Sequence, residues 1–339
     1  MVDLSIGSPV DQSPAVAREA LIAAADSHAY PLTAGSVALR EAIVEWFARR
    51  RGVPGLSIAN VMPSIGSKEL VGLLPLFLGL GNGDTVVHPR IAYPTYAIGA
   101  AIVGASVVAS DDPTDWPPST RLVWVNSPGN PTGRVLTGAE LRRAVERARE
   151  LGAVIASDEC YAEFNWVGSE PTTSILHPDV IAGDRRSVLA LYSLSKQSNL
   201  AGYRASFVTG DSELIAELLA VRKHAGLIPP APVQAATAAA LSDETHVSHQ
   251  RDHYRARRAR LLPALKSAGY RIDDSEAGLY LWATQGQDAW TTVGELADAG
   301  ILVVPGPFYG GHAAQHVRIA LTATDAAIAD AVARLALLS

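Results

Sequence analysis

The feature of this sequence that most constrains its fold is a series of short, continuously apolar runs separated by helical patterns. The runs are rich in β-branched residues: DTVVHP (84–89), ASVVAS (105–110), RLVWVN (121–126), AVIASDE (153–159), SVLALYS (187–193) and ASFVTGD (205–211). Continuous rather than alternating apolarity is typical of strands that are buried on both faces. The pattern therefore predicts an α/β architecture with a mostly parallel sheet between two layers of helices.

The clearest of the intervening helices is predicted for residues 137–151. Thr137 and Glu140 have the spacing of a capping box, which satisfies the free N–H groups of a helix start. Apolar residues then recur on one face up to Leu151, as expected for a helix that packs on a sheet.

The character of the sequence changes after GLIPPAPVQ (226–234). A long basic helical stretch, HQRDHYRARRARLLPALKSAG, leads into the shorter strand candidates GLYLWAT, ILVVPG and HVRIALT and an alanine-rich closing helix. We expect a second, smaller α+β domain. Residues 31–235 would form the larger α/β domain, and residues 1–30 together with 236–339 the smaller one.

Composition restricts the class of protein. Apolar residues make up 48% of the 339 and charged ones 18%, which is typical of a globular enzyme. The formal charge of −6 argues against a nucleic-acid partner. The single cysteine, Cys160, excludes an internal disulfide framework and fits a reducing cytoplasm; we interpret it as a small buried residue. No signal peptide is visible. The uncharged segment 91–110 contains prolines and glycines, so it predicts a helix followed by a buried strand rather than a membrane span.

Polar side chains stand where several predicted strands end. Strand 121–126 runs into NSPGNPTG, strand 153–159 ends on a carboxylate pair followed by Tyr161, and strand 187–193 is followed by Lys196. In open α/β sheets, ligands bind outside the carboxyl ends of the strands. We therefore expect these side chains to surround one ligand.

That set of side chains suits pyridoxal 5′-phosphate. This cofactor needs a lysine amine for its Schiff base, a carboxylate that keeps its pyridine nitrogen protonated, and donors around its phosphate. A buried carboxylate such as Asp158 holds that proton by direct charge pairing. The nine histidines show no metal-ligand spacing, so no metal is expected.

Three motifs together resemble those of the class I and II aminotransferases of fold type I. They are NPTG (130–133), SDECY (157–161) and SLSKQSNLAGYR (193–204), in this order. The resemblance extends from about Gly7 to Arg318. It implies a fold type I architecture with a seven-stranded, mostly parallel sheet, pyridoxal 5′-phosphate as cofactor and a cytoplasmic enzyme. Only six residues precede Gly7, whereas members of the family usually carry a further N-terminal helix or arm.

The resemblance also implies roles for residues around the cofactor ring. Lys196 matches the Schiff-base lysine that moves the proton, and Asp158 matches the partner of the pyridine nitrogen. Asn130 and Tyr161 match the pair that hydrogen-bonds the phenolic oxygen, although Tyr161 could instead be a core tyrosine. Tyr93 matches the aromatic residue that stacks on the ring, the alternative being a simply packed tyrosine.

A second group of residues matches the phosphate ligands of the family. SIGSKEL (64–70) opens a helix, so the amides from Gly66 to Lys68 form an anion site at its N-terminus. Ser67 and Lys68 add side-chain donors, although helix capping alone would explain Ser67. Ser193 and Arg204 match a hydroxyl and an arginine ligand, and the fixed fork of arginine donors suits a phosphate.

Three further residues match positions that bind substrate or join subunits. Arg318 matches the arginine that binds the substrate α-carboxylate, with a structural salt bridge as the alternative; Asn130 contributes to the same site. The segment at Gly7 matches the one that closes over that carboxylate. Tyr30 matches a tyrosine that reaches the phosphate in the neighbouring subunit, which implies a homodimer with shared active sites; an ordinary interface or turn residue is the alternative.

For the substrate, the sequence most resembles the actinobacterial succinyldiaminopimelate aminotransferases. The stretches that carry this resemblance include IGSKELVGLLP, SDECYAEFNW, SEAGLYLWAT and ALTATD. It implies transfer of an amino group from glutamate to N-succinyl-2-amino-6-oxopimelate in lysine biosynthesis, with 2-oxoglutarate as the other product. A long diacid needs cations away from Arg318, and Lys223, His224 and Arg90 are candidates.

Other interpretations stay open at this point. An aspartate, aromatic or general glutamate:keto-acid aminotransferase would share every cofactor residue, as would a C–S lyase. The same fold also serves as a ligand-sensing module in transcription regulators, which carry a DNA-binding domain not visible in this sequence. A cofactor-free homologue is the third alternative, against which the presence of both Lys196 and Asp158 argues.

Overall fold

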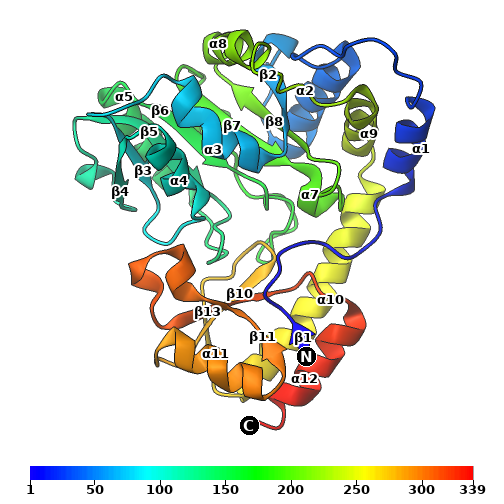
Figure 1. The fold of residues 1–339 in the computed structure, drawn as a ribbon, viewed down its shortest axis with the longest axis vertical. Helices are drawn as coiled ribbons and strands as arrows, with labels where there is room; N and C mark the ends of the chain where they lie inside the picture. Colours follow the sequence, from blue (N-terminus) through cyan, green and yellow to red (C-terminus); the bar gives the residue numbers. More distant parts are fainter. Residues whose placement is uncertain (339) are drawn as a thin grey trace.

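The computed structural model describes residues 1–338 and is organised around a seven-stranded sheet with the order β2-β8-β7-β6-β5-β3-β4 (Figure 1). The strands are β2 (Val61–Ile65), β3 (Thr85–His88), β4 (Ser106–Ala109), β5 (Thr120–Asn126), β6 (Val154–Asp158), β7 (Val188–Ser193) and β8 (Ala205–Gly210). Only β8 runs antiparallel to its neighbours β2 and β7. The predicted α/β architecture with a mostly parallel sheet is confirmed.

Helices cover both faces of this sheet. One layer consists of α2 (Val37–Arg51), α5 (Gly138–Glu150) and α9 (Ala231–Leu241), and the other of α3 (Ser67–Phe77), α4 (Thr95–Ile102) and α8 (Ser212–Arg222). Alternate residues of one strand pack against different layers: Val123 and Val125 of β5 against the first, Leu122 and Trp124 against the second. This two-sided burial explains why the central strands are continuously apolar.

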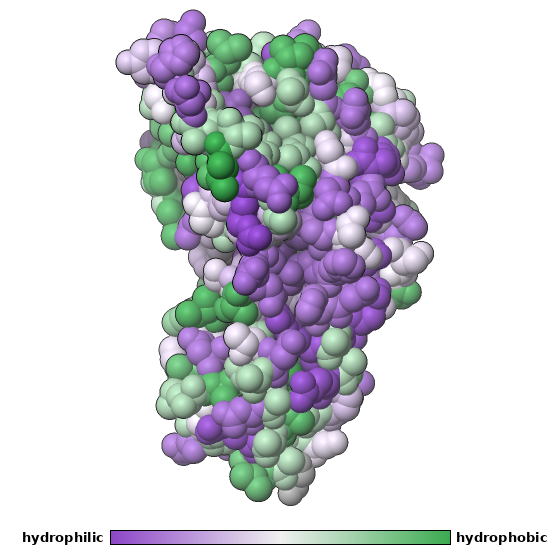
Figure 2. Space-filling view, turned by 90° about the vertical axis from the view of Figure 1, so that its right-hand side faces the viewer, coloured by the Kyte–Doolittle hydropathy of each residue, from purple (hydrophilic) through white to green (hydrophobic). Residues whose placement is uncertain are grey.

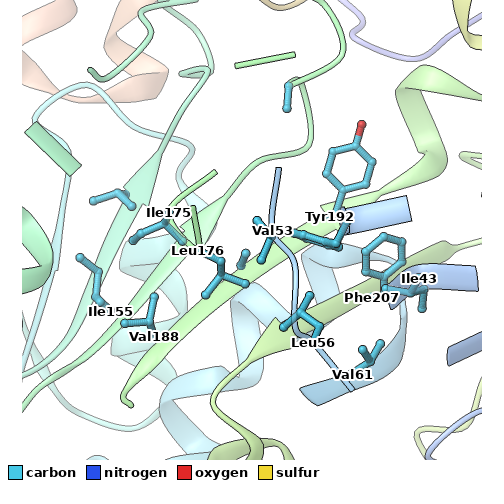
Figure 3. Close-up of a cluster of buried hydrophobic side chains, with 14 of the residues drawn as sticks. Ile43, Val53, Leu56, Val61, Ile155, Ile175, Leu176, Val188, Tyr192 and Phe207 are labelled. Atoms are coloured by element: carbon cyan, nitrogen blue, oxygen red, sulfur yellow. The ribbon is translucent and has the colours of Figure 1, made fainter. Parts of the chain in front are cut away.

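Figure 3 shows part of the first of these cores. Phe207 of β8 lies beside Ile43 of α2, with Tyr192 of β7 next to it and the Tyr192 hydroxyl pointing away from the cluster. Ile155 of β6 and Val188 of β7 belong to the same core and lie near Leu176. The Tyr192 hydroxyl donates a hydrogen bond to Oε1 of Gln197, 2.6 Å away, so no polar group of this ring is left unpaired.

The predicted helix at 137–151 is confirmed as α5. Thr137 is its N-cap, and its hydroxyl accepts a hydrogen bond from the Glu140 amide while the Glu140 carboxylate accepts one from the Thr137 amide. This reciprocal pair is the capping box that the spacing predicted.

Two strands differ from the sequence-based expectation. Strand β2 was not predicted, because Pro63 interrupts its short apolar run; a proline is tolerated there since β2 is an edge strand. Strand β4 was predicted to be buried, which is wrong. It lies at the opposite edge, where only one neighbour pairs with it, and Ser106 and Val107 are exposed.

The smaller part of the molecule lies below the large sheet in Figure 1. It contains a four-stranded antiparallel sheet of order β12-β13-β10-β9 and a parallel pair, β1-β11. The strands are β1 (Val2–Asp3), β9 (Arg271–Asp273), β10 (Tyr280–Thr284), β11 (Ile301–Leu302), β12 (Val304–Pro305) and β13 (His316–Ala320). The strands predicted from GLYLWAT, ILVVPG and HVRIALT are therefore confirmed. Helices α11 (Ala289–Asp298) and α12 (Asp325–Leu335) complete this part.

The long basic helix is α10 (Thr245–Ser267), which connects the two parts along one side of the molecule. Tyr254, Arg257 and Leu261 are buried on its inner face, whereas Asp252 and Arg255 are exposed. On the face that α10 occupies, hydrophilic residues form a broad band at mid-height (Figure 2). The division of the chain at residues 30 and 235 stays a prediction. Helix α1 (Ala15–Ala23), which that division assigns to the smaller domain, packs against α9 beside the large sheet. Within residues 1–338, no helix is long and apolar enough to cross a membrane.

Candidate active site

The carboxyl ends of three neighbouring parallel strands lie at the edge of the large sheet that faces the smaller part. β5 ends at Asn126, β6 at Asp158 and β7 at Ser193. A pocket of about 330 Å³ lies at this edge, closed on its other side by residues 6–8 and by Tyr280 and Arg318 of the smaller part.

Most of the predicted site residues line this one pocket. They are Gly7, Ser67, Lys68, Tyr93, Asn130, Asp158, Tyr161, Ser193, Lys196, Arg204 and Arg318. They come from seven separate stretches of the chain, so only the fold brings them together. Gly66 lies immediately behind the pocket, against Arg204, and Tyr30 is not part of it.

Asp158 is a buried carboxylate with neutral hydrogen-bond donors. Its side chain is 7% exposed; Oδ2 accepts a hydrogen bond from the Tyr96 hydroxyl at 2.9 Å and Oδ1 one from the Cys160 amide at 3.3 Å. Among the residues that the structure describes, no cation pairs with it. Burial raises the pKa of Asp158, because desolvation disfavours the charged form.

Lys196 extends from α7 (Leu194–Gln197), a single turn that directly follows β7. Its ammonium group donates a hydrogen bond to the carbonyl oxygen of Gly7. A side chain at Gly7 is excluded, because a Cβ there would overlap the hydroxyl of Tyr280. The N-terminal segment is therefore held close over the lysine amine.

Gly66 and Arg204 form a tight cradle at the start of α3. Gly66 has φ = 77°, a left-handed conformation that favours glycine, and a Cβ there would lie 1.9 Å from Nη2 of Arg204. The Gly66 amide donates to the Arg204 carbonyl oxygen at 2.8 Å, and no side chain caps the helix start. Ser67 and the buried Ser193 stand beside this cradle. The arrangement leaves helix-terminal amides, hydroxyls and a guanidinium available to one multiply charged anion.

Arg318 is a buried guanidinium on β13 that is held by neutral groups. Nη2 donates to the carbonyl oxygen of Ser5 at 2.6 Å and Nη1 to Oδ1 of Asn130 at 3.2 Å. Its Cζ atom lies 4.1 Å from the ring centroid of Tyr280, a cation–π contact. Nε is buried without a partner among the described residues. A structural salt bridge, the alternative interpretation, is absent from residues 1–338.

Two tyrosine hydroxyls meet at the centre of the pocket. Those of Tyr161 and Tyr280 are 3.1 Å apart. Burial raises the pKa of Tyr161. Burial would also raise the pKa of Tyr280, but the positive charges of Arg318 and Lys196 outweigh it, so that its pKa is lowered. Of the two hydroxyls, that of Tyr161 therefore holds its proton more strongly.

Tyr30 lies outside the pocket, and its side chain is 99% exposed. Its predicted contact is with the site of a neighbouring subunit, so the role of Tyr30 stays a prediction. The candidates for a distal substrate carboxylate, Lys223, His224 and Arg90, are exposed and do not line the pocket; Arg90 bonds to His312 instead.

Sequence reasoning missed several residues that the structure brings to the pocket. Asn126 donates to the Asp158 carbonyl oxygen at 2.9 Å and accepts from the Asn130 amide at 2.8 Å, joining two predicted residues. Its position as the last residue of a strand could have indicated it. Tyr96 and Tyr280 carry no such signal, because tyrosines in apolar segments are usually core residues.

Comparisons with known proteins identify the family of the chain. A family model described as aminotransferase class I and II matches residues 1–335. The chain is 55% identical over 336 residues to the probable aminotransferase Rv1178 of Mycobacterium tuberculosis, covering 99% of this chain and 80% of that protein. It is 51% identical, again over 336 residues, to the 4-dedimethylamino-4-oxo-anhydrotetracycline transaminase OxyQ of Streptomyces rimosus, covering 99% and 93%.

More distant relatives and solved structures extend the same result. An LL-diaminopimelate aminotransferase of Aquifex aeolicus is 32% identical over 355 residues, with 99% of this chain and 90% of that protein covered. The crystal structure of an aminotransferase from Neisseria meningitidis superimposes with a TM-score of 0.92 at 31% identity, covering 99% of this chain and 92% of the other.

Proposed function

The chain belongs to the class I and II aminotransferases, and on that premise we propose that it transfers the amino group of glutamate to N-succinyl-2-amino-6-oxopimelate. The products would be N-succinyl-LL-diaminopimelate and 2-oxoglutarate. The observation that carries this proposal is the buried guanidinium of Arg318, which has no anionic partner within residues 1–338 and lines the same pocket as Lys196.

Enzymes of this family use pyridoxal 5′-phosphate, and the pocket has features that fit it. The Gly66–Arg204 cradle, which a single Cβ would fill, suits the phosphate, with Ser67, Lys68 and Ser193 as further donors. When bound, the cofactor joins the substrate amine and withdraws electrons from the substrate Cα, so that its proton can leave.

The chain's own residues would hold the ring in place. Asp158 would accept the hydrogen bond of the pyridine nitrogen, since a buried carboxylate without a cation gains most from a positive partner. Asn130 and Tyr161 would donate to the phenolic oxygen, and Tyr93 would cover one face of the ring.

Two residues would act on the substrate. Arg318 would bind the α-carboxylate through its planar fork, exchanging the carbonyl of Ser5 for an anion. Lys196 would take the Cα proton on its Nζ atom and return it to the carbon of the cofactor that is bonded to the substrate nitrogen, because its position at the end of β7 directs the amine into the pocket.

The choice of a long diacid as acceptor rests on relatives. Relatives named for LL-diaminopimelate match almost the whole chain.

A second candidate acceptor is a bulky cyclic ketone. The 51% identity to a protein named as a tetracycline-precursor transaminase favours it. Both candidates use the same cofactor residues, so only the acceptor distinguishes them.

The assembly that we propose is a homodimer in which Tyr30 reaches the partner's site. Tyr30 is almost fully exposed, and the apolar side chains of Ile22, Leu32 and Val37 nearby in the sequence are exposed as well. Sedimentation velocity on the holoenzyme tests this: a monomer at micromolar concentration would overturn it.

The substrate proposal is tested by two half-reactions. The holoenzyme is first converted with glutamate, which changes the absorbance of its cofactor, and is then mixed with each acceptor. We expect N-succinyl-2-amino-6-oxopimelate to restore the original spectrum at lower concentration than oxaloacetate, phenylpyruvate or a polycyclic ketone. Faster recovery with any of the other three would replace this substrate with that one.

A further inference from the structure

Tyr96 lies behind the pocket, in α4, and none of the motifs discussed above includes it. Its side chain is fully buried, and its ring stacks on Trp124 with centroids 5.0 Å apart and an angle of 22° between the planes. The ring edge meets Tyr93, at 5.9 Å and 84°. These two rings leave Tyr96 little freedom to turn.

The Tyr96 hydroxyl is thereby directed at one atom. It donates to Oδ2 of Asp158 at 2.9 Å, and both groups are buried. Burial strongly raises the pKa of Tyr96, and the negative charge of Asp158 raises it further, so the proton stays on the tyrosine and the hydrogen bond has one direction.

The ionised form of Asp158 depends on this hydrogen bond, because few other groups compensate for the cost of burying its charge. Its other donor is Cys160, whose amide lies at 3.3 Å from Oδ1, longer than an ordinary hydrogen bond. Desolvation raises the pKa of Asp158, whereas the bonds from Cys160 and Tyr96 lower it. A hydrogen bond to the charged form is the means by which a buried carboxylate stays ionised.

We propose that Tyr96 is a positioning residue of the reaction: its hydroxyl keeps Asp158 ionised and aimed at the cofactor's pyridine nitrogen, so that the proton between them stays on the nitrogen. The proposal rests on the placement of Asp158 opposite that nitrogen in the proposed function. A ring that keeps its proton is the stronger electron acceptor, so Tyr96 would act on the rate through Asp158 without touching substrate.

The test uses the holoenzyme reconstituted with cofactor labelled with ¹⁵N in the ring, observed by NMR in wild type and in Tyr96→Phe. The phenylalanine keeps the ring stack on Trp124 and removes only the donor. We expect the ¹⁵N resonance to move toward the value of an unprotonated ring, and kcat to fall about tenfold to a hundredfold, the effect of losing one hydrogen bond to a charged group. KM for glutamate should change little.

The matched control is Tyr254→Phe, which also removes a buried tyrosine hydroxyl but in the core of the smaller part, where Tyr254 packs on Phe164. It should leave the ¹⁵N resonance unchanged. An unchanged resonance in Tyr96→Phe, whatever its kcat, would overturn the proposal, since a purely structural role for Tyr96 cannot move the proton.

Two further variants complete the design. Asp158→Asn must move the resonance toward the unprotonated value; if it does not, the placement of Asp158 in the proposed function fails. If it does and Tyr96→Phe does not, only the inference about Tyr96 fails. Should Tyr96→Phe not fold, 4-aminophenylalanine at position 96 keeps a weaker donor in the same shape. It should move the resonance in the same direction by a smaller amount, and no movement would overturn the proposal.

Discussion

Two consecutive carboxylates at the end of β6, Asp158 and Glu159, have opposite electrostatic surroundings. Glu159 is paired: Arg51 donates to it at 2.7 Å, and Ser174 and the Ile175 amide donate to its other oxygen. Asp158 is buried to a similar degree but has only Tyr96 and Cys160 as donors, and no cation among the described residues.

The same contrast separates the arginines. Arg222 is buried against Glu69 at 2.5 Å, whereas Arg318 is buried with carbonyl oxygens and tyrosine rings, and its Nε has no hydrogen-bond partner within residues 1–338. A buried charge without a countercharge costs free energy, so a fold retains one only where a ligand completes the pair. Paired charges therefore mark the scaffold here, and unpaired charges mark the pocket.

The largest effect should come from the pocket side, with Lys196→Ala. Among the described residues, the Lys196 ammonium group forms a hydrogen bond only with the Gly7 carbonyl, so the fold should survive while transamination falls below detection. Borohydride treatment followed by mass spectrometry should find no cofactor attached to the chain. Lys223→Ala, an exposed lysine, is the control, and an adduct that persists in Lys196→Ala would refute the lysine assignment.

Asp158→Asn should reduce kcat by on the order of 10²–10³, the cost of removing one member of a buried charge pair. When both proteins lack cofactor, the variant should be at least as stable as wild type, because the buried asparagine carries no charge that must be desolvated. Steady-state kinetics and thermal unfolding measure the two effects. A loss of stability with kcat preserved would mean that Asp158 belongs with the scaffold charges.

Glu159→Gln should show the reverse behaviour. It leaves Arg51 buried without a countercharge, so we expect the free energy of unfolding to fall by about 3–5 kcal/mol, measured with urea. Below the unfolding transition, kcat should stay close to wild type. The control is Glu244→Gln, whose exposed pair with Arg49 is worth about 0–1 kcal/mol. If kcat falls as in Asp158→Asn, the contrast between the neighbouring carboxylates is broken.

Arg318→Gln should raise KM for glutamate about tenfold to a hundredfold, since a charge-assisted bidentate contact is lost. Reaction with an amine that lacks the α-carboxylate should be nearly unaffected. Equal losses for both amines would show that Arg318 shapes the pocket rather than binding the carboxylate.

The smallest effect is a pH dependence of stability in the cofactor-free protein. Because burial raises the pKa of Asp158, the native state binds this proton more tightly than the unfolded state does. Relative to Asp158→Asn, wild type should therefore lose stability as pH rises from the unfolded value, about 3.9, through the raised native value. The loss is about 1.4 kcal/mol for each unit by which the pKa of Asp158 in the native state exceeds its pKa in the unfolded state. Urea unfolding of both proteins between pH 4 and about pH 7 measures this loss. If the difference between their free energies of unfolding does not change with pH, the predicted direction is wrong.

Much of the fold could be predicted because its signals are local. Continuous apolar runs identify β3, β5, β6, β7 and β8, and the Thr137–Glu140 pair identifies the start of α5. The misses are at the edges: β2 contains a proline, and β4 is apolar but exposed. Apolarity alone cannot distinguish a central strand from an edge strand, because position in the sheet is decided by pairing far along the chain.

The residues of the candidate site also fall into two groups, those that local sequence indicates and those that only tertiary packing brings to the site. Lys196, Asp158 and Asn130 stand next to strand ends and turns, so their sequence neighbours indicate them. Tyr280 lines the pocket, and Tyr96 reaches Asp158 from behind it, only because tertiary packing brings β10 and α4 to the large sheet.

The sequence by itself determined the type of sheet, the helix at 137–151 and the identity of the groups at the strand ends, since periodicity, capping and turn chemistry act over a few residues. Only the tertiary structure decided which buried charges receive a partner. Arg51 comes from α2 to meet Glu159, whereas a tyrosine of α4 meets Asp158. These contacts span 108 and 62 residues, beyond the reach of any local pattern.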